Sequence, residues 1–212
     1  MAAHIPHLLL SGPWAAEGRL PVTEEQRHHL DKVVRLGSGD PVTYTDGEGA
    51  IGSGSYLEGE VTRGEEHRVP RPSDLTVVTA PPDNRDRARF LVEKLSETGV
   101  AELRFLRTRY GQGRPPKVER LRAWAVSGLE QSRGAWLLKT PEGLVTFCDL
   151  EPPYAVCERG GDRSAPSART VVIGPEGGWA PDEIPEGAIR FDLGDTVLRL
   201  ETAALIAVAR MI

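Results

Sequence analysis

Two glycine-rich loops near the end of the chain constrain its fold more than any other feature. Residues 173–178 read Ile-Gly-Pro-Glu-Gly-Gly, and residues 193–203 read Leu-Gly-Asp-Thr-Val-Leu-Arg-Leu-Glu-Thr-Ala. Each loop follows a short apolar run, Thr170–Ile173 or Ile189–Leu193, as expected where a strand ends. Because ligands of α/β sheets bind beyond the carboxyl ends of the strands, we expect the two loops to form one pocket lined largely by backbone groups.

The chain from residue 73 onwards alternates between predicted strands and predicted helices. Apolar residues at helical spacing predict a helix over Asp86–Thr98, and further helices are expected at Lys117–Gln131 and Glu201–Ile212. Between them lie short apolar runs that predict strands: Leu75–Ala80, Leu103–Arg107, Ala155–Cys157, Thr170–Ile173 and Ile189–Leu193. Such alternation is typical of an α/β fold with a mostly parallel sheet and helices on both faces.

The first 72 residues have a different character and predict a small β-rich domain. Turn signals separate predicted strands at Pro41–Thr45 and Tyr56–Thr62, and a short helix is expected over His28–Leu36. The segment Pro70–Ser73 reads Pro-Arg-Pro-Ser and is a natural linker, because proline cannot continue a strand ladder. We therefore expect two domains, 1–72 and 73–212.

Composition excludes several classes of protein. No run of about 18 apolar residues is present, so no membrane span is expected, and the N-terminus lacks the pattern of a secretory signal. Two cysteines, Cys148 and Cys157, do not make a disulfide framework, and no Cys/His cluster has the spacing of zinc ligands. The simplest expectation is a cytoplasmic protein without a metal.

The charge distribution favours a nucleic-acid partner more than the net charge does. The whole chain carries a formal charge of −5. The segment from Arg104 to Arg133, however, contains eight basic residues and only two acidic ones, Glu119 and Glu130. Its net charge is therefore 8 − 2 = +6. Such a segment can follow a phosphate backbone, although a solvated helix face with its loop would look the same.

The two loops together resemble the RsmE family of SPOUT methyltransferases. The pattern G-P-E-G-G-[FW]-x-x-x-E is matched from Gly174 to Glu183, and L-G-x-x-[IV]-L-R-x-E-T-A from Leu193 to Ala203. The resemblance implies transfer of a methyl group from S-adenosylmethionine to N3 of a uridine in small-subunit ribosomal RNA. It also implies a trefoil knot in the C-terminal domain and a homodimer.

The N-terminal third extends the resemblance. The stretch from His29 to Leu36, then Gly39-Asp40 and Asp46-Gly47, is similar to the PUA-like RNA-binding domain of the family. Two departures concern the expected RNA side. Asn84 stands where the family usually has lysine, and histidines stand at positions 4 and 7 where members tend to carry arginine.

The resemblance also assigns residues to roles. Arg199 is the candidate for stabilising the uracil anion, because N3 becomes nucleophilic when its proton leaves; the alternative role for Arg199 is to position a phosphate. Candidates for holding the cofactor are Ile173, Gly174, Pro175, Glu176, Gly177, Gly178, Leu193, Gly194, Leu198, Leu200, Thr202 and Ala203. Candidates for contacting RNA are Arg35, Arg85, Arg87, Gln131 and Arg133.

Several alternatives stay open at this point. Glu201, the second catalytic candidate, has three possible roles: orienting Arg199, favouring the N-terminus of the following helix, or accepting the N3 proton. The activity itself has two alternatives. One is a SPOUT methyltransferase acting on another base or on a ribose 2′-OH, and the other is an RNA-binding protein that has lost catalysis.

Overall fold

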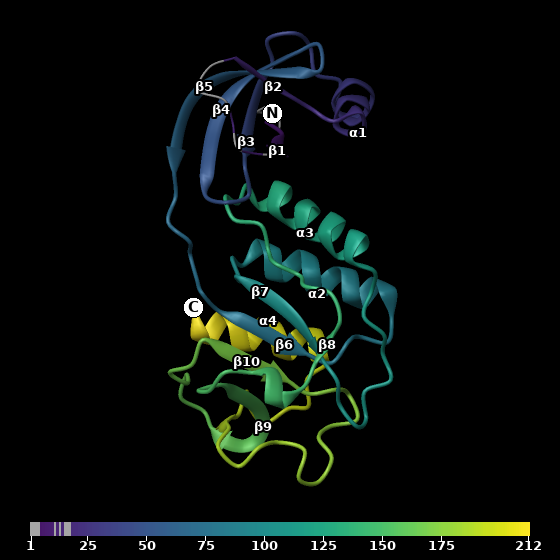
Figure 1. Ribbon diagram of the computed structural model, residues 1–212, viewed down its shortest axis with the longest axis vertical. Coiled ribbons are helices and arrows are strands. Elements are labelled where there is room, and N and C mark those ends of the chain that lie inside the picture. Colours follow the sequence, from purple (N-terminus) through teal and green to yellow (C-terminus); the bar gives the residue numbers. More distant parts are fainter. Residues whose placement is uncertain (1–4, 11, 13, 15–17) are drawn as a thin grey trace. The chain divides into compact units, whose positions relative to one another are not determined.

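The computed structural model describes residues 5–10, 12, 14 and 18–212 (Figure 1). Contacts divide the chain into two compact units. The first contains the residues up to Arg71 together with Leu129–Leu137, and the second contains Pro72–Gly128 and Leu138–Ile212. The break after Arg71 falls inside the predicted linker. The segment Leu129–Leu137, in contrast, belongs to the first unit, whereas the predicted second domain, 73–212, includes it.

The first unit is built on a five-stranded sheet in the order β1-β3-β4-β5-β2. The strands β1 and β3 are parallel, and the other neighbouring pairs are antiparallel. The predicted strand Pro41–Thr45 is confirmed as β3. The remaining strands are β1 (His7–Leu9), β2 (Arg19–Pro21), β4 (Ala50–Leu57) and β5 (Glu60–Arg68).

The predicted strand Tyr56–Thr62 is wrong, because it spans the end of β4, a turn and the start of β5. Glu58 and Gly59 have φ values of 50° and 91° and reverse the chain between the two strands. Glycine supplies the left-handed conformation that such a tight hairpin needs, so Gly59 is the signal that marked the turn. Tyr56 and Val61 are partners across this hairpin and are both buried.

The predicted helix His28–Leu36 begins earlier than expected. The helix α1, Glu24–His28, starts at a capping box in which Thr23 and Gln26 satisfy each other's backbone N–H groups. It continues into a π-helix, η1 (His29–Val34), which Arg35 ends with a left-handed φ of 62°. Leu30 of η1 is fully buried in a core shared with the sheet, which includes Leu8, Leu10, Leu20, Val42, Tyr44, Tyr56 and Val61.

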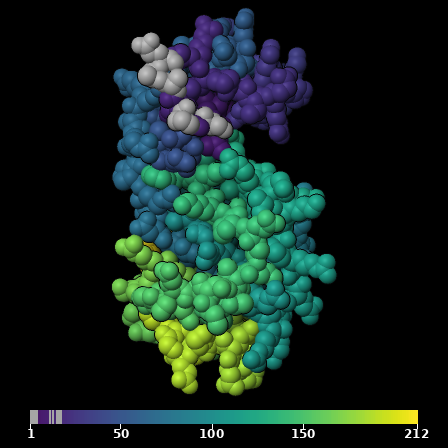
Figure 2. All heavy atoms as spheres, in the orientation of Figure 1, coloured from purple at the N-terminus to yellow at the C-terminus, as the bar shows by residue number. Residues whose placement is uncertain are grey.

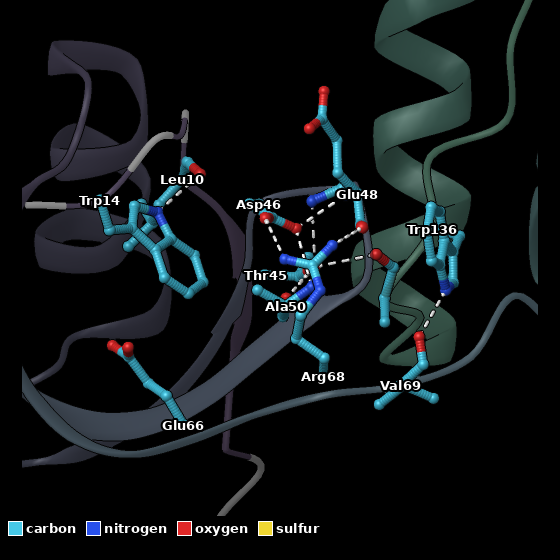
Figure 3. A network of polar contacts seen from close by, with 12 residues as sticks. Leu10, Trp14, Thr45, Asp46, Glu48, Ala50, Glu66, Arg68, Val69 and Trp136 are labelled. Atoms are coloured by element: carbon cyan, nitrogen blue, oxygen red, sulfur yellow. Dashed lines mark hydrogen bonds and ion pairs between the residues drawn. The ribbon is translucent and has the colours of Figure 1, made fainter.

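The segment Leu129–Leu137 completes the first unit from far along the chain (Figure 3). Trp136 donates from Nε1 to the carbonyl of Val69 at 3.0 Å, and the N–H of Gly49 donates to the carbonyl of Ala135 at 2.8 Å. In the same turn, the Asp46 carboxylate accepts from the backbone N–H groups of Glu48 and Ala50 at 2.7 and 3.0 Å. The turn between β3 and β4 is therefore held from both sides.

The second unit is built on a six-stranded sheet in the order β11-β9-β10-β6-β7-β8. Every neighbouring pair is parallel, so the predicted parallel sheet is confirmed. The strand β10 has the predicted bounds, and β9 extends five residues beyond the prediction. The strands are β6 (Thr76–Thr79), β7 (Glu102–Leu106), β8 (Leu144–Val145), β9 (Ala155–Asp162), β10 (Thr170–Ile173) and β11 (Ile189–Phe191).

Each long helix lies within one residue of its predicted ends, because each carries a clear apolar stripe. The helices are α2 (Arg85–Glu97), α3 (Val118–Ser132) and α4 (Leu200–Met211). The helix α4 contacts α2, β6 and β10, as Figure 1 shows for the yellow helix beside β6 and β10. The helix α3 is joined to α2 by a hydrogen bond of 2.8 Å from Ser96 Oγ to the carbonyl of Ala125.

The expectation of helices on both faces of the sheet is corrected. In the part of the chain that the structure describes, one face carries an apolar cluster without an α-helix over it. Val78 and Val172 of the sheet pack there against side chains from a short 3₁₀-helix, η2 (Phe147–Asp149), and from loops. The covering residues are Phe147, Leu150, Tyr154, Trp179 and Ile184. In place of an α-helix, η2 and the loops between β8 and β11 cover this face of the sheet.

Candidate functional site

The loops after β10 and β11, together with residues of strand β9, line one cavity of about 330 Å³, which we call the first pocket. Its size is typical of small-ligand sites. In the space-filling view the residues after β10 and β11, green-yellow to yellow, gather at one end of the second unit (Figure 2). Ten of the twelve predicted cofactor residues line it: Ile173, Gly174, Pro175, Glu176, Gly178, Leu193, Gly194, Leu198, Leu200 and Ala203.

The two other predicted residues lie nearby. Gly177 lines a neighbouring cavity of about 240 Å³, which we call the second pocket. Thr202 is exposed in the first turn of α4 and lines neither cavity. The two pockets share a wall, because Pro175, Glu176 and Leu200 line both of them. The motif loops therefore contribute to two adjoining cavities, whereas the sequence predicted one.

Trp179 explains why residue 174 is a glycine. A Cβ atom at position 174 would lie 2.8 Å from Cε2 of the Trp179 ring, closer than real contacts allow. The indole Nε1 donates to the carbonyl of Cys157 at 3.2 Å, which holds the ring in place beside the first pocket. The loop after β10 is thereby tied to the end of β9.

Asp192 shapes the loop after β11 and was missed by sequence reasoning. Its buried carboxylate accepts from the N–H groups of Gly194 at 2.9 Å and Gly160 at 3.2 Å, and these hydrogen bonds lower the pKa of Asp192. Gly194 has a φ of 135°, which favours glycine. An acid two residues before a glycine is a signal for such a turn, so Asp192 was detectable.

The middle of strand β9 supplies a third side of the first pocket, and no sequence motif marked it. Cys157, Glu158 and Arg159 line it, together with Trp179, Thr196 and Val197 from the motif loops. Burial raises the pKa of Cys157 to about 12, so its thiol stays protonated near neutral pH. Because the thiolate is the nucleophilic form, this cysteine is a weak nucleophile at neutral pH.

Arg87 lies at the centre of an acidic cluster beside the shared wall. Its Nη2 donates to Glu201 Oε2 at 2.7 Å and its Nε lies 3.1 Å from Glu201 Oε1. It also forms ion pairs with Glu176 and with Asp83, the latter at 3.3 Å. The side chain of Arg87 is only 18% exposed. One guanidinium thus joins the start of α2, the loop after β10 and the start of α4.

The electrostatics of Glu201 follow from this contact. Burial is the largest single influence and pushes the pKa of its carboxyl upward. Hydrogen bonds from Arg87 and from its own backbone N–H, with the nearby charges of Arg87 and Arg199, together leave the pKa below its ordinary value. The pKa of Arg87 is raised in turn, chiefly by its hydrogen bonds to Glu201 and Glu176. Glu201 is therefore a carboxylate at neutral pH, and its partner is Arg87, whereas the sequence analysis had considered Arg199.

Arg199 occupies the N-cap position of α4 and is exposed. It lines neither pocket, although its neighbours Leu198 and Leu200 do. Within the described residues its guanidinium makes no hydrogen bond or ion pair. Its charge is close enough to Glu201 to contribute to the lowered pKa of that carboxyl. It is therefore a cation at the rim with its donors available.

The predicted RNA contacts are distributed over both units. Arg35, Gln131 and Arg133 belong to the first unit and are exposed; Arg133 Nη2 also donates to the carbonyl of Ile5 at 3.1 Å. Arg85 is exposed at the start of α2 in the second unit, where Arg87 is engaged by its three acids.

The two departures from the family pattern have structural explanations. Asn84, where the family usually has lysine, is the N-cap of α2 and accepts from the N–H of Asp86 at 2.8 Å. His7 is buried; its ring nitrogens lie 2.8 Å from Thr43 Oγ1 and 3.0 Å from the carbonyl of Gly134. Burial lowers the pKa of His7, which keeps the ring neutral. Position 4 lies outside the described residues.

The described residues include neither a membrane-spanning helix nor a cluster of metal-binding side chains. No helix there is long and apolar enough to cross a membrane. No group of three or more His, Cys, Asp or Glu side chains in the same residues is placed to hold a metal ion.

Comparison with known proteins decides the family. The model of the RNA methyltransferase domain matches residues 69–212, which is well over half of the chain. The chain belongs to the RNA methyltransferase domain family. The ribosomal RNA small subunit methyltransferase E of Synechocystis sp. is 26% identical over 92% of this chain and 73% of its own length.

Solved structures agree with the fold over almost the whole length. The ribosomal RNA small subunit methyltransferase E from Neisseria gonorrhoeae, bound to S-adenosyl methionine, has a TM-score of 0.82 at 22% identity and covers 97% of this chain and 96% of its own. A probable rRNA-methyltransferase from Porphyromonas gingivalis has a TM-score of 0.74 at 26% identity, with 90% of each chain covered. The likeness extends beyond the family domain to the first unit.

Proposed function

We propose that this member of the RNA methyltransferase family transfers a methyl group from S-adenosylmethionine to N3 of a uridine in small-subunit ribosomal RNA. The observation that carries the proposal is the meeting of both motif loops in one glycine-rich pocket at the carboxyl ends of β10 and β11. The names of the relatives supply the class of RNA, and the resemblance to the RsmE family supplies the N3 position.

The first pocket fits the cofactor by its size and chemistry. An adenosyl group needs close backbone approach for its polar edge and apolar walls for its faces. Gly174, Gly178 and Gly194 offer such approach, and Ile173, Leu198 and Ala203 offer apolar surface. The carboxylates of Glu158 and Glu176 in the lining suit a cationic ligand. S-adenosylmethionine would supply a methyl group that is already activated, so the protein's task is positioning.

Arg199 and Glu201 have different proposed roles. The free guanidinium of Arg199 at the rim of the pockets can stabilise negative charge that develops on uracil as N3 loses its proton. Glu201 acts through Arg87, because its carboxylate is already engaged and its lowered pKa makes it a weak proton acceptor. Its contribution is to hold Arg87 and Glu176 in position beside the shared wall.

Assembly and architecture complete the proposal. We propose that the C-terminal unit contains the trefoil knot of the SPOUT fold, that the first unit is a PUA-like RNA reader, and that the protein works in the cytoplasm as a homodimer. Val197 supports the dimer, because it lines the first pocket and is 84% exposed, and Ile212 is 54% exposed at the end of α4. Ala203 and Val208, in contrast, are already buried within the subunit.

The decisive experiment compares methylated nucleosides with and without the protein. Small ribosomal subunits from a deletion strain are incubated with the purified protein and S-adenosylmethionine, and the digested RNA is analysed by mass spectrometry. We expect 3-methyluridine at one site, absent without protein. A methylated ribose or another methylated base would favour a different RNA methyltransferase activity. Tight cofactor binding by calorimetry with no methylated product on any RNA would overturn the assignment.

A further inference from the structure

The second pocket has no assigned occupant, although it adjoins the proposed cofactor site. It is formed by the loops after β6, β7 and β10, and it shares Pro175, Glu176 and Leu200 with the first pocket. A group bound there lies against the same wall as a ligand in the first pocket. Its volume of about 240 Å³ is too small for a folded RNA element and large enough for one base.

An exposed aromatic ring stands at this pocket. Tyr110, in the loop between β7 and α3, is 50% exposed and lines the cavity beside Gly177. Single unstacked bases are recognised in proteins by stacking on such rings.

The loop that carries Tyr110 is fixed to the motif loop by the signature glutamate. Glu183 Oε1 accepts from the backbone N–H of Arg109 at 2.6 Å, while its Oε2 accepts from the N–H of Ala180 at 2.9 Å. Arg109 Nη1 also donates to the carbonyl of Pro181 at 3.2 Å. The ring is therefore carried on an anchored loop, which limits the entropy lost when a base stacks on it.

The polar groups around the cavity match the edge of uracil. Uracil presents two carbonyl acceptors on either side of the N3–H donor. Glu176 offers a carboxylate acceptor at the shared wall, and the backbone N–H groups of Gly111, Gln112 and Gly113 donate to no other atom in the described part of the chain. Backbone donors next to a carboxylate acceptor are the groups that pair with such an acceptor–donor–acceptor edge.

The same loop is strongly basic and continues into the start of α3. Five of its side chains are exposed cations that form neither an ion pair nor a side-chain hydrogen bond among the described residues: Arg107, Arg114, Lys117, Arg120 and Arg122. Glu119 is the one acid between positions 107 and 122. Cations that lack a protein partner are available to phosphates, and in the sequence these five lie on either side of the lining residues Tyr110–Gly113.

We propose that the second pocket receives the acceptor uracil, flipped out of the RNA, with Tyr110 stacking on its face and the basic segment 107–122 holding the adjacent phosphates. The proposal rests on the proposed function and adds the place where the substrate base binds. Enzymes that act on a base take it out of its stack, and a small cavity with one ring and a polar edge is the usual receiver.

The test uses a base probe that requires no methyl transfer. The full-length protein is saturated with S-adenosylhomocysteine to fill the first pocket, and uridine 5′-monophosphate is added at millimolar concentration. Saturation-transfer NMR then reports contact between protein and the H5 and H6 protons of the base. We expect clear signals with the wild type. The control variant is Phe90→Ala, which should give the same signals, because Phe90 is an exposed aromatic residue on α2 that lines neither pocket.

Two variants probe the pocket itself. Tyr110→Ala removes the ring, and Gln112→Trp fills the cavity from an exposed position. Both should lose the base signals while retaining affinity for S-adenosylhomocysteine, and Tyr110→Phe should keep the signals. With RNA, Tyr110→Ala should lower the single-turnover rate by about tenfold to a hundredfold, the range for loss of one stacked base.

The outcomes separate this proposal from the proposed function. Equal base signals in the wild type, Tyr110→Ala and Gln112→Trp, or no signal in the wild type, would overturn the base pocket. Absence of 3-methyluridine in the wild-type reaction would instead overturn the activity, and the NMR measurement would still report on the pocket.

Discussion

Arg87 and Glu201 are 114 residues apart in sequence and form a two-pronged ion pair, with Arg87 donating from both Nε and Nη2 to the carboxylate. The pair joins the start of α2 to the start of α4, the helix that begins at the second motif loop. Arg87 also reaches Glu176 in the first motif loop. A single side chain therefore sets the spacing of the elements around the wall between the pockets.

Removal of Arg87 should destabilise the protein. Arg87→Ala leaves Glu201 largely buried without its partner, and we expect the free energy of unfolding to fall by on the order of 2 kcal/mol. Arg87→Lys keeps the charge and loses the planar fork, so it should recover part of this. Arg89→Ala on the same helix breaks only the exposed pair with Glu93 and should cost at most about 0.5 kcal/mol. Urea unfolding measures all three, and equal losses for Arg87→Ala and Arg89→Ala would refute the role.

The same pair predicts a pH dependence. The folded pKa of Glu201 is below its ordinary value, so its ionised form adds stability above the unfolded pKa of about 4.3, and this stability is lost as pH falls through the folded pKa. Glu201→Gln should therefore be less stable than the wild type at about pH 7, and the difference should shrink below about pH 4. A difference that stays constant across this range would show that the ion pair contributes little.

A substitution at Gly194 tests the cofactor site, and a matched substitution at Gly143 controls for the backbone strain that it introduces. Gly194→Ala forces a side chain into a left-handed conformation beside the first pocket, and Gly143→Ala does so at a site with equally open space outside both pockets. We expect similar losses of thermal stability in both, since each glycine has a positive φ. Calorimetry with S-adenosylmethionine should show weaker binding only for Gly194→Ala. Unchanged affinity there would remove the loop after β11 from the cofactor site.

Arg199 should affect catalysis more than cofactor binding, because it lines neither pocket and has free donors. Loss of one electrostatic donor to a developing anion costs on the order of 10²–10³ in rate. Arg199→Ala should show this loss in single-turnover transfer with saturating RNA, with S-adenosylmethionine affinity unchanged, and Arg199→Lys should recover part of the rate. Near-normal transfer by Arg199→Ala would end the catalytic assignment, and a loss of cofactor affinity alone would move the residue to the first pocket.

RNA binding by the first unit is best tested with point variants. Deleting residues 1–72 would leave Trp136 without Gly49 and Val69, so lost activity after that deletion would have two explanations. Arg35→Glu changes an exposed charge at the end of η1. It should weaken RNA binding and flatten its dependence on salt, while cofactor affinity stays the same. An unchanged salt dependence in a filter-binding assay would exclude Arg35 from the RNA contact.

Sequence patterns predicted the three α-helices of the second unit and all of its described strands except β8, because each of these elements carries its own apolar signal. The two-residue strand β8 and the short helix η2 were not predicted. Val171 and Val172 lie on a strand with the predicted bounds, and α2 begins one residue from its expected start. The hairpin around Glu58 was missed, because the predicted strand Tyr56–Thr62 continues through the turn although Gly59 lies in its middle. The patterns also placed ten of the twelve expected residues around one pocket.

What the sequence lacked was contact between distant segments. Nothing local to Glu201 indicates Arg87 as its partner, since Arg199 stands two residues away and carries the same charge. Division of the motif loops between two cavities likewise depends on Tyr110 and Gly113, which reach the site from the loop after β7. Ion pairs and pocket walls between segments that are distant in the sequence depend on the tertiary packing. A motif identifies only the residues of its own segment.

The contact between Trp136 and the turn at Gly49 determines when the first unit can be completed during synthesis. A Cβ at position 49 would lie 2.4 Å from the Trp136 ring, so the indole fills space that the glycine leaves open. The five strands of this unit have all left the ribosome long before Trp136 is made, and domains generally fold as units in the order of synthesis. The first unit therefore cannot be completed, and the turn at Gly49 lacks its contact with Trp136, until more than half of the chain has been translated.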